Sequence, residues 1–211
     1  MCNIPSSNYA TLSGEEEAQY TFWGAASNQE LRRRKLRVVD VGGGSTELIS
    51  GASSVITNMH SIDIGHVRLT ETLKITDPIA DSKIRELTNH VNEKLRGEHL
   101  AAADEDEMLV GVGGTFTTLA QIDMAMEKYD ADRIQGYGMA RETISALREK
   151  MQNVALPDRR RISGLSPTRA DVIVAGVAIV ENIMQELRFD EVTVSTRGLR
   201  HGVLVQKMQA G

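Results

Sequence analysis

The segment "VVDVGGGSTELISG" limits what this chain can fold into more than any other segment does. It begins with β-branched residues and Asp40, continues with the consecutive glycines Gly42–Gly44, and ends with a second apolar run that has Glu47 near its start. Short runs rich in β-branched residues predict buried strands, so two strands joined by a tight turn are expected here. A hairpin of that kind requires only one or two glycines, and the third glycine therefore needs a separate explanation.

Phosphate binding supplies such an explanation. Glycine has no Cβ, so phosphate oxygens can approach its N–H group closely, and successive N–H groups in a turn form a concave anion site. Ser45 and Thr46 add hydroxyl donors, and Asp40 is placed to hold Mg²⁺ directly or through water. The alternative is a glycine-rich hairpin with Asp40 at the surface, and this segment alone leaves both open.

A second segment, "MLVGVGGTFTTLA", repeats the pattern of strand, glycines and hydroxyl residue. Gly113 and Gly114 end the expected strand, and Thr115 is predicted to cap the following helix, whose first turn adds partial positive charge. Because residues 111 to 116 do not match GxGxxG, a dinucleotide fingerprint is set aside. Two such loops on neighbouring strands predict a phosphate clamp, and the alternative is an ordinary strand–turn–helix joint.

The order of the expected elements predicts an α/β fold with a mixed sheet and helices on its faces. Three strands come first with short turns between them, which favours antiparallel pairing, and two later strands are separated by helices, which favours parallel additions. The strands are expected at 36–41, 45–50, 54–64, 108–112 and 191–195. Helices are expected from about 15, and at about 67–74, 81–96, 116–126, 141–151, 169–187 and 198–208.

Composition and charge exclude several classes of function. With 41% hydrophobic and 25% charged residues in 211, the chain suits one soluble domain. Its net charge of -5 argues against a general nucleic-acid binder. The single cysteine, Cys2, permits no disulfide framework within the chain and predicts a reducing, cytoplasmic location. The longest apolar stretch, at Val172 to Val180, is too short to span a bilayer, so no membrane association is expected.

Several segments in a fixed order resemble a known family. The segment "DVGGGSTEL" resembles the second phosphate loop of the actin, heat-shock chaperone and sugar-kinase superfamily. Within that superfamily, four segments resemble the Ppx/GppA phosphatases, which are exopolyphosphatases and guanosine pentaphosphate phosphohydrolases. These are "LSGEEEA" at 12–18, "VVDVGGGSTEL" at 38–48, "VGVGGTFTTLA" at 110–120 and "RADVIVAG" at 169–176, with support from "VSTRGLRHGVL" at 194–204.

This resemblance implies an RNase H-like (actin-like ATPase) fold and Mg²⁺-dependent hydrolysis of the terminal phosphoanhydride of polyphosphate or guanosine pentaphosphate, by a homodimer. By position, Glu17 matches the proposed catalytic base, Glu47 an acid around the attacking water, and Asp40 a metal ligand. The positions that match phosphate binders are Gly42, Gly43, Gly44, Ser45, Thr46, Gly113, Gly114, Thr115 and Arg200.

The chain also departs from the family's pattern. The family begins with another actin-like half that has its own phosphate loop, and no such motif occurs in this sequence. We therefore expect residues 1–27 to be the end of that first half and residues 28–211 to be the second domain. Glu17 would then lie on a helix without its packing partner. This chain alone would therefore bind phosphate weakly and show little or no phosphatase activity. The family's His-Gly and Arg-Glu-Gly appear here as Gln135-Gly136 and Arg200-His201-Gly202.

Two other functions fit the sequence: a non-catalytic module that binds polyphosphate or nucleotides, and a kinase or ATPase half. The segment "SGEEEA" favours a hydrolase over a kinase, which needs an acceptor site instead of a base. The basic clusters Arg32–Lys35 and Asp158–Arg161 are predicted to be solvated charge. Arg169 and Arg200 are either phosphate contacts or structural ion pairs, and the five histidines show no metal-ligand spacing.

Overall fold

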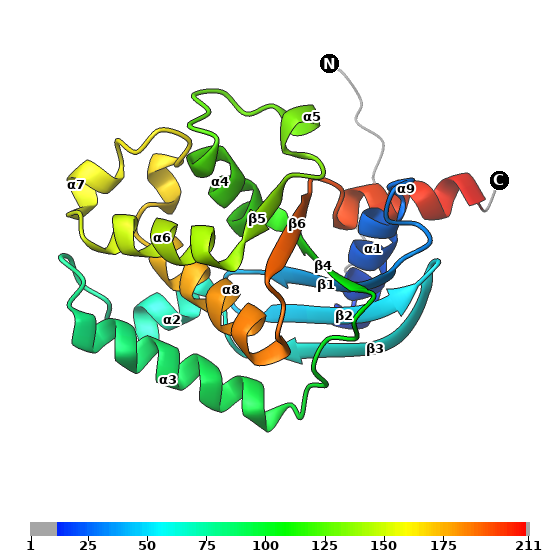
Figure 1. Cartoon of the computed structure of the whole chain (residues 1–211), viewed down its shortest axis with the longest axis horizontal. Helices are drawn as coiled ribbons and strands as arrows, with labels where there is room; N and C mark the ends of the chain where they lie inside the picture. The colour runs from blue at the N-terminus through cyan, green and yellow to red at the C-terminus, as the bar shows by residue number, and fades with distance from the viewer. Residues whose placement is uncertain (1–11, 210–211) are drawn as a thin grey trace, which may run out of the picture.

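The computed structural model describes residues 12–209 and shows one mixed six-stranded sheet with helices on both faces (Figure 1). The strand order across the sheet is β3-β2-β1-β4-β6-β5. The strands are β1 (Lys35–Val41), β2 (Thr46–Ala52), β3 (Val55–Ile62), β4 (Glu107–Val112), β5 (Gly138–Ala140) and β6 (Glu191–Ser195).

Strand directions follow the predicted plan. The first three strands pair antiparallel, whereas β1, β4 and β6 run parallel to one another. This confirms the expectation of an antiparallel start followed by parallel additions. The short edge strand β5, which pairs antiparallel with β6, was not predicted, because three residues carry too little alternation to be recognised.

Five helices cover one face of the sheet (Figure 1): α2 (His66–Thr72), α3 (Asp81–Gly97), α4 (Gly113–Asp123), α6 (Arg141–Gln152) and α8 (Ile173–Leu187). The apolar stripe of α3 is buried in the main core, as its helical spacing predicts; it consists of Ile84, Leu87, Val91 and Leu95. Two helix starts differ from expectation, since α4 begins at Gly113 and α8 begins after a short 3₁₀ turn at Pro167–Arg169. Short helices α5 (Ala131–Ile134) and α7 (Leu156–Arg159) complete this layer.

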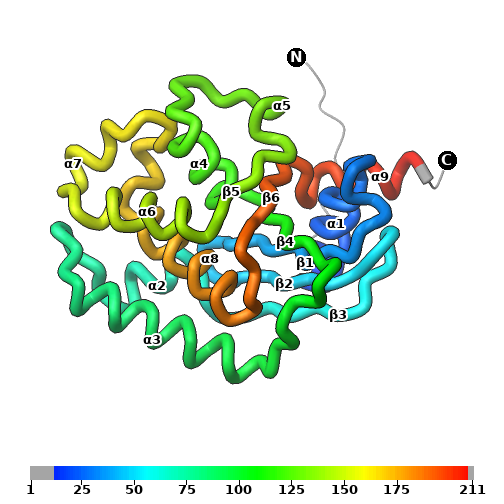
Figure 2. The backbone as a smooth tube through the Cα atoms, viewed as in Figure 1, coloured from blue at the N-terminus to red at the C-terminus, as the bar shows by residue number. Residues whose placement is uncertain are grey.

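Two helices from opposite ends of the chain, α1 (Gly14–Ala26) and α9 (Leu199–Gln209), lie side by side on the other face (Figure 2). The fully buried Phe22 packs there in a second core with Val38, Ile49 and Val110. A capping box between Ser13 and Glu16 fixes the start of α1.

The helix that carries Glu17 therefore has packing partners within this chain, and the expectation that it lacks them is wrong. Its close fit to α9 depends on glycine, because a side chain on Gly202 would overlap the backbone of Tyr20. Gly24 faces the backbone of Gly198 in the same way. These contacts could not be anticipated from sequence spacing, since the two helices lie about 180 residues apart in the chain.

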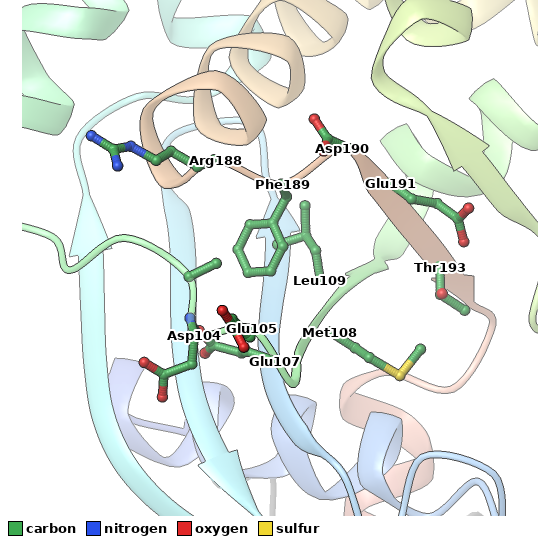
Figure 3. A pocket seen from close by; sticks show the side chains of 11 residues that line it. Asp104, Glu105, Glu107, Met108, Leu109, Arg188, Phe189, Asp190, Glu191 and Thr193 are labelled. Atoms are coloured by element: carbon green, nitrogen blue, oxygen red, sulfur yellow. Dashed lines mark hydrogen bonds between the residues drawn. The ribbon is translucent and has the colours of Figure 1, made fainter.

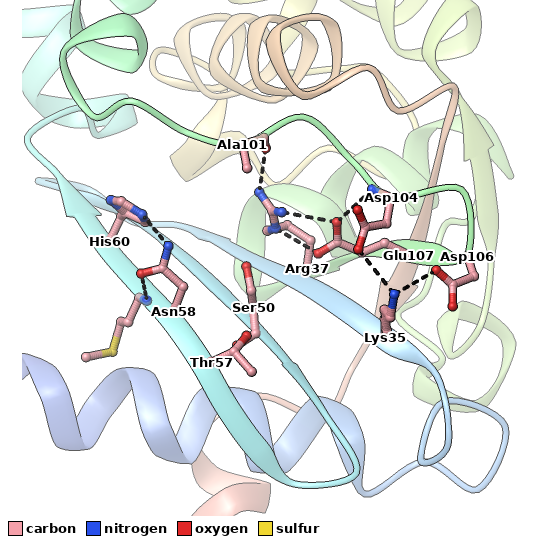
Figure 4. A network of polar contacts seen from close by, with 11 residues as sticks. Lys35, Arg37, Ser50, Thr57, Asn58, His60, Ala101, Asp104, Asp106 and Glu107 are labelled. Carbon is pink, nitrogen blue, oxygen red and sulfur yellow. Dashed lines mark hydrogen bonds and ion pairs between the residues drawn. The ribbon is translucent and has the colours of Figure 1, made fainter.

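A buried ion pair ties β1 to β4 at the amino-terminal end of both strands (Figure 4). Arg37 donates from Nε and Nη2 to the two carboxylate oxygens of Glu107 at 2.9 and 3.1 Å, and from Nη1 to the carbonyl of Ala101. Because such a bidentate pair satisfies both side chains, loss of either partner alone leaves a buried charge. The neighbouring pairs of Lys35 with Asp104 and Asp106 are exposed and contribute little.

None of the helices within residues 12–209 has the length and apolar character needed to cross a membrane.

Replacement of Phe22 by Ala tests whether α1 is part of this domain. We expect the free energy of unfolding to fall by about 3–5 kcal/mol, because a fully buried ring is replaced by a cavity. The measurement is chemical denaturation, with the exposed Gln19→Ala on the same helix as the control. A loss below about 1 kcal/mol would show that α1 is not needed for folding.

Candidate functional site

The carboxyl ends of β1, β4 and β6 meet at one edge of the sheet, which is where ligands bind in open α/β sheets. Asp40 is in register with Val112, and Val112 is in register with Ser195. Three loops therefore lie next to one another: the glycine loop 42–45, the start of α4, and the turn 195–198.

The glycine loop turns its carbonyl groups toward α2. The carbonyl of Gly42 accepts from His66 N at 3.0 Å, and that of Gly43 accepts from Val67 N and Arg68 N at 3.1 and 3.0 Å. The carbonyl of Gly44 accepts from Arg68 Nε at 2.8 Å. In contrast, the amides of residues 43–45 donate to no acceptor in the part of the chain that the structure describes. Carbonyls bound on one side and amides free on the other are what an anion-binding turn needs.

The second loop requires glycine at position 113, and a side chain at position 114 would displace Arg169. Gly113 has φ +82°, a conformation that side chains rarely adopt, and any Cβ there would overlap Oδ1 of Asp40. A Cβ on Gly114 would overlap the guanidinium of Arg169. The loop leads directly into α4, whose first N–H groups have no partner within the helix and carry partial positive charge.

The sequence permits two roles for Arg169, a phosphate contact or a structural ion pair, and the surroundings of its side chain favour the first. Its guanidinium lies against Gly114, at the start of α4, and is partly buried. Among the described residues 12–209 it makes no ion pair, in contrast to eight other Lys and Arg side chains of the domain. An unpaired, half-buried guanidinium beside free amides is suited to binding an anion.

The segment before Arg169 is held by a buried arginine. Arg159 is fully buried and donates to the carbonyls of Met151, Val154 and Ala170 at 2.7 to 3.1 Å, and to Asp77 at 2.6 Å. The prediction of solvated charge is therefore wrong for Arg159, while it is correct for its exposed neighbours Arg160 and Arg161.

Three carboxylates converge at the same edge. Asp40 and Glu47 are directly opposite each other on β1 and β2, and Glu17 on α1 is close enough to act on Asp40. Burial, together with the negative charges of Glu47 and Glu17, raises the pKa of Asp40 from 3.8 to about 7, and burial is the largest of these causes. Ser45 and Ser61 donate to Oε1 of Glu47 at 2.6 and 3.1 Å, which orients that side chain.

These residues suit a Mg²⁺ ion that is held partly by phosphate oxygens and waters, and not an ion held by protein ligands alone. No group of three or more His, Cys, Asp or Glu side chains within residues 12–209 is arranged to hold a metal by itself. Asp40 is nevertheless a buried carboxylate without a cationic partner there, and Mg²⁺ in phosphate sites commonly takes one or two carboxylates, with phosphate oxygens and waters completing its shell.

Several residues expected to bind phosphate face elsewhere. The hydroxyl of the fully buried Thr46 donates to the carbonyl of Ile64 at 2.6 Å, and that of Thr115 donates to Val41 at 3.2 Å. The prediction that Thr115 caps α4 is wrong, because α4 has no side-chain cap. The side chain of Arg200 is exposed on α9, and its role in phosphate binding stays a prediction.

Two other hollows of the surface are poor candidates for the phosphate site. One is lined mainly by acids, and the other lies far from Asp40. At the amino-terminal ends of β4 and β6, a hollow of about 400 Å³ has one cation in its lining, Arg188, against five carboxylates (Figure 3), so its charge disfavours anions; the carboxylates are those of Asp104, Glu105, Glu107, Asp190 and Glu191. A hollow lined by Arg32 and Arg33 lies beside the hairpin of residue 53. That hairpin joins β2 and β3 at the end far from Asp40.

The strand order and the loops at the carboxyl edge define an RNase H-like domain of the actin-like ATPase fold, with a candidate phosphate site. A model of the Ppx/GppA phosphatase family matches residues 7–210. The chain therefore belongs to this family.

Relatives and solved structures agree with that assignment. Exopolyphosphatase 2 of Mycobacterium tuberculosis is 31% identical over 205 residues, which cover 95% of this chain and 64% of the relative. The bifunctional 3-dehydroquinate synthase/phosphatase of Fusobacterium nucleatum is 29% identical, over 94% of this chain and 30% of the relative. A Ppx/GppA family member from Aquifex aeolicus superimposes with a TM-score of 0.87 at 29% identity, over 94% of this chain and 64% of that structure. This chain thus spans a little less than two thirds of the exopolyphosphatase.

Replacement of Asp40 by Asn should stabilise the domain at alkaline pH in the absence of metal. The raised pKa means that the contribution of Asp40 to stability is fully present below pH 3.8 and is lost as the pH rises through about 7. The variant lacks this loss, so its melting temperature should exceed the parent's by several degrees at pH 8, since 1 kcal/mol corresponds to about 2–4 °C.

Thermal melting of both proteins between pH 4 and pH 8, with a chelator present, measures this difference. Asp132→Asn, at an exposed position, serves as the control and should show no such trend. A gap between Asp40→Asn and the parent that is the same at pH 4 and pH 8 would contradict the burial of a charged carboxylate.

Proposed function

We propose that this chain carries the phosphate-binding lobe of a hydrolase that cleaves the terminal phosphoanhydride bond of polyphosphate or guanosine pentaphosphate. The observation that carries the proposal is the juxtaposition of free loop amides, the unpaired Arg169 and the carboxylates of Asp40, Glu47 and Glu17 at one sheet edge. Such hydrolysis needs bound phosphate oxygens, a positioned water and a group that accepts its proton. The names of the exopolyphosphatase relatives support the same chemistry.

In this proposal the amides of residues 43–45, those at the start of α4, and Arg169 bind the terminal phosphoryl group. Glu17 accepts a proton from water as the water attacks phosphorus, and Glu47, oriented by two serines, helps to position that water. The anhydride P–O bond breaks, and orthophosphate and a chain shorter by one phosphate are the products. Asp40 would hold Mg²⁺, which when bound neutralises charge on the phosphate oxygens.

The remaining parts of the proposal rest on the family resemblance. They are the division into the end of a first lobe at 1–27, whose helix α1 packs on the strands of the second lobe at 28–211, a homodimeric state and a cytoplasmic location. Membership in the Ppx/GppA family is compatible with each of them. The alternative function is a module that binds the same anions without hydrolysing them.

Replacement of Arg169 by Ala tests the phosphate site. We expect the affinity for inorganic tripolyphosphate in the presence of Mg²⁺ to fall about 10- to 100-fold, since a charge-assisted hydrogen bond is worth about 1.5–3 kcal/mol. The measurement is isothermal titration calorimetry, with Arg96→Ala, at an exposed position of α3, as the matched control. Equal affinities for both variants would remove Arg169 from the site.

Replacement of Glu17 by Gln tests hydrolysis. The side chain keeps its size but loses its basicity, so phosphate release from tripolyphosphate should fall about 10²- to 10⁴-fold while the affinity stays within about twofold. The exposed Glu15→Gln in the same helical turn is the control and should retain turnover. Tight binding by the parent with no release of phosphate at any enzyme concentration would favour the non-catalytic alternative.

A further inference from the structure

The side chain of His66 lies beside the first glycine loop and close to the second. Its backbone N–H donates to the carbonyl of Gly42 at 3.0 Å, and Cε1 of its ring would lie 4.0 Å from a Cβ on Gly43. On α8, a Cβ on Gly176 would lie 3.5 Å from that of His66 and 3.1 Å from Cγ2 of Thr115. The first residue of α2 is therefore held next to the first loop and near the start of α4.

His66 shares a pocket with Arg169. The pocket has a volume of about 430 Å³ and opens between α2 and the 3₁₀ turn that precedes α8. The guanidinium of Arg169 lies against Gly114, and its charge acts on the ring of His66. The carboxylate of Asp171 acts on the same ring and is exposed to solvent. The ring, the guanidinium and the free amides of the loops thus lie at one place.

The imidazole of His66 is neutral in the free protein at pH 8. Burial lowers the pKa of its ring from 6.5, the positive charge of Arg169 has the same effect, and the carboxylate of Asp171 opposes them. A neutral imidazole carries one proton, which makes one nitrogen a donor and the other an acceptor. The nitrogen that carries the proton therefore decides what the ring can bind.

The burial of Nδ1 favours one of the two tautomers. Nδ1 of His66 is buried and, within residues 12–209, has no hydrogen-bond partner. A proton there would create an unpaired buried N–H, and such donors are rarer in native proteins than unpaired acceptors. Nε2 is not left buried and unpaired in this way. A proton on Nε2 therefore gives the ring a donor at the wall of the pocket.

A group that is rich in acceptors would satisfy all of the donors at this place. The amides of residues 43–45, the guanidinium of Arg169 and an Nε2–H of His66 can only donate, and a phosphoryl group offers oxygens to each of them. A metal ion would be repelled by the charge of Arg169. The exposed Asp171 is surrounded by water, whose high dielectric constant weakens its repulsion of an anion.

We propose that His66 is a further phosphate-binding residue, which donates from Nε2 to an oxygen of the phosphoryl group held by the glycine loops and Arg169. This inference rests on the proposed function, because that group must occupy the loops for the contact to form. It deepens the function by adding a neutral donor from α2, outside both loops. It also gives a reason for retaining a buried, unpaired Nδ1, since such costs are retained chiefly at functional sites.

Calorimetric titration of the full chain with inorganic tripolyphosphate, at pH 8 with Mg²⁺ present, tests the contact. Glutamine and asparagine both offer amide donors, but the glutamine nitrogen comes close to the position of Nε2 and the asparagine nitrogen to that of Nδ1. We expect His66→Gln to stay within about threefold of the parent's affinity and His66→Asn to lose about tenfold, the value of one hydrogen bond to an anion. The control His99→Asn, at an exposed position, should bind like the parent.

Nitrogen-15 NMR of the histidine rings provides a readout that a purely structural role would not move. In the parent at pH 8, Nε2 of His66 should carry the proton, and its resonance should shift when tripolyphosphate is added. The ring of the exposed His99 should show no such shift. The signals that disappear in His66→Gln identify the resonances of His66.

Two outcomes would overturn the inference: equal affinities of His66→Gln and His66→Asn, or a parent whose ring carries its proton on Nδ1 with tripolyphosphate bound. Arg169→Ala separates this failure from that of the proposed function. If Arg169→Ala weakens tripolyphosphate binding while either outcome is found, the phosphate site stands and only the role of His66 is wrong. If Arg169→Ala has no effect, the phosphate site itself is wrong and the contact of His66 falls with it.

Discussion

The parallel pairing of β1 with β4 is the constraint on which the candidate site depends. Its register sets Asp40 opposite Val112, so the carboxylate at the end of one strand meets the glycine that follows the next. A slip of one residue would move Asp40 to the other face of the sheet, because side chains alternate along a strand. The buried pair of Arg37 and Glu107 joins the same two strands at their opposite end, where it crosses the ladder diagonally, because Arg37 is in register with Leu109 and Glu107 with Lys35. This structural ion pair thus supports the strand pairing on which the site depends, although it lies on β1 three residues before Asp40.

At the carboxyl edge of the sheet, positively and negatively charged groups lie near one another without forming ion pairs. Acids gather around Asp40 on the face covered by α1, whereas Arg169 and the free amides lie around the glycine loops, and the ion pairs of residues 12–209 leave both groups uncompensated. Such an arrangement costs stability in the free protein, and native proteins retain costs of this kind chiefly at functional sites. The buried Arg159 shows the contrasting case, in which every strong donor of a guanidinium is used for structure.

Sequence reasoning predicted the sheet and the two loops because these depend on local patterns. Runs of β-branched residues predicted the strands, and consecutive glycines predicted the turns at Gly42–Gly44 and at Gly113. It did not predict the roles of Thr46 and Thr115, since a hydroxyl in a phosphate-loop motif can face either the ligand or the backbone, and only packing decides which. It also assigned Arg159 to solvent, because three consecutive arginines look alike in sequence although one is buried by contacts with residues as distant as Asp77. The packing of α1 against α9 could not be predicted for the same reason, because glycine contacts between distant segments have no periodic pattern.

The packing of α1 changes how the site can be understood. Glu17 belongs to a helix whose buried face contacts the same strands that carry Asp40 and Glu47, so the three carboxylates are positioned by one rigid layer. The distance between the proposed base and the metal ligand is therefore fixed by the core around Phe22 and Val38. Small displacements of a catalytic group cost about a hundredfold in rate. If Glu17 is the base in the proposed hydrolysis, the packing beneath α1 would control the rate as directly as the residues that line the site.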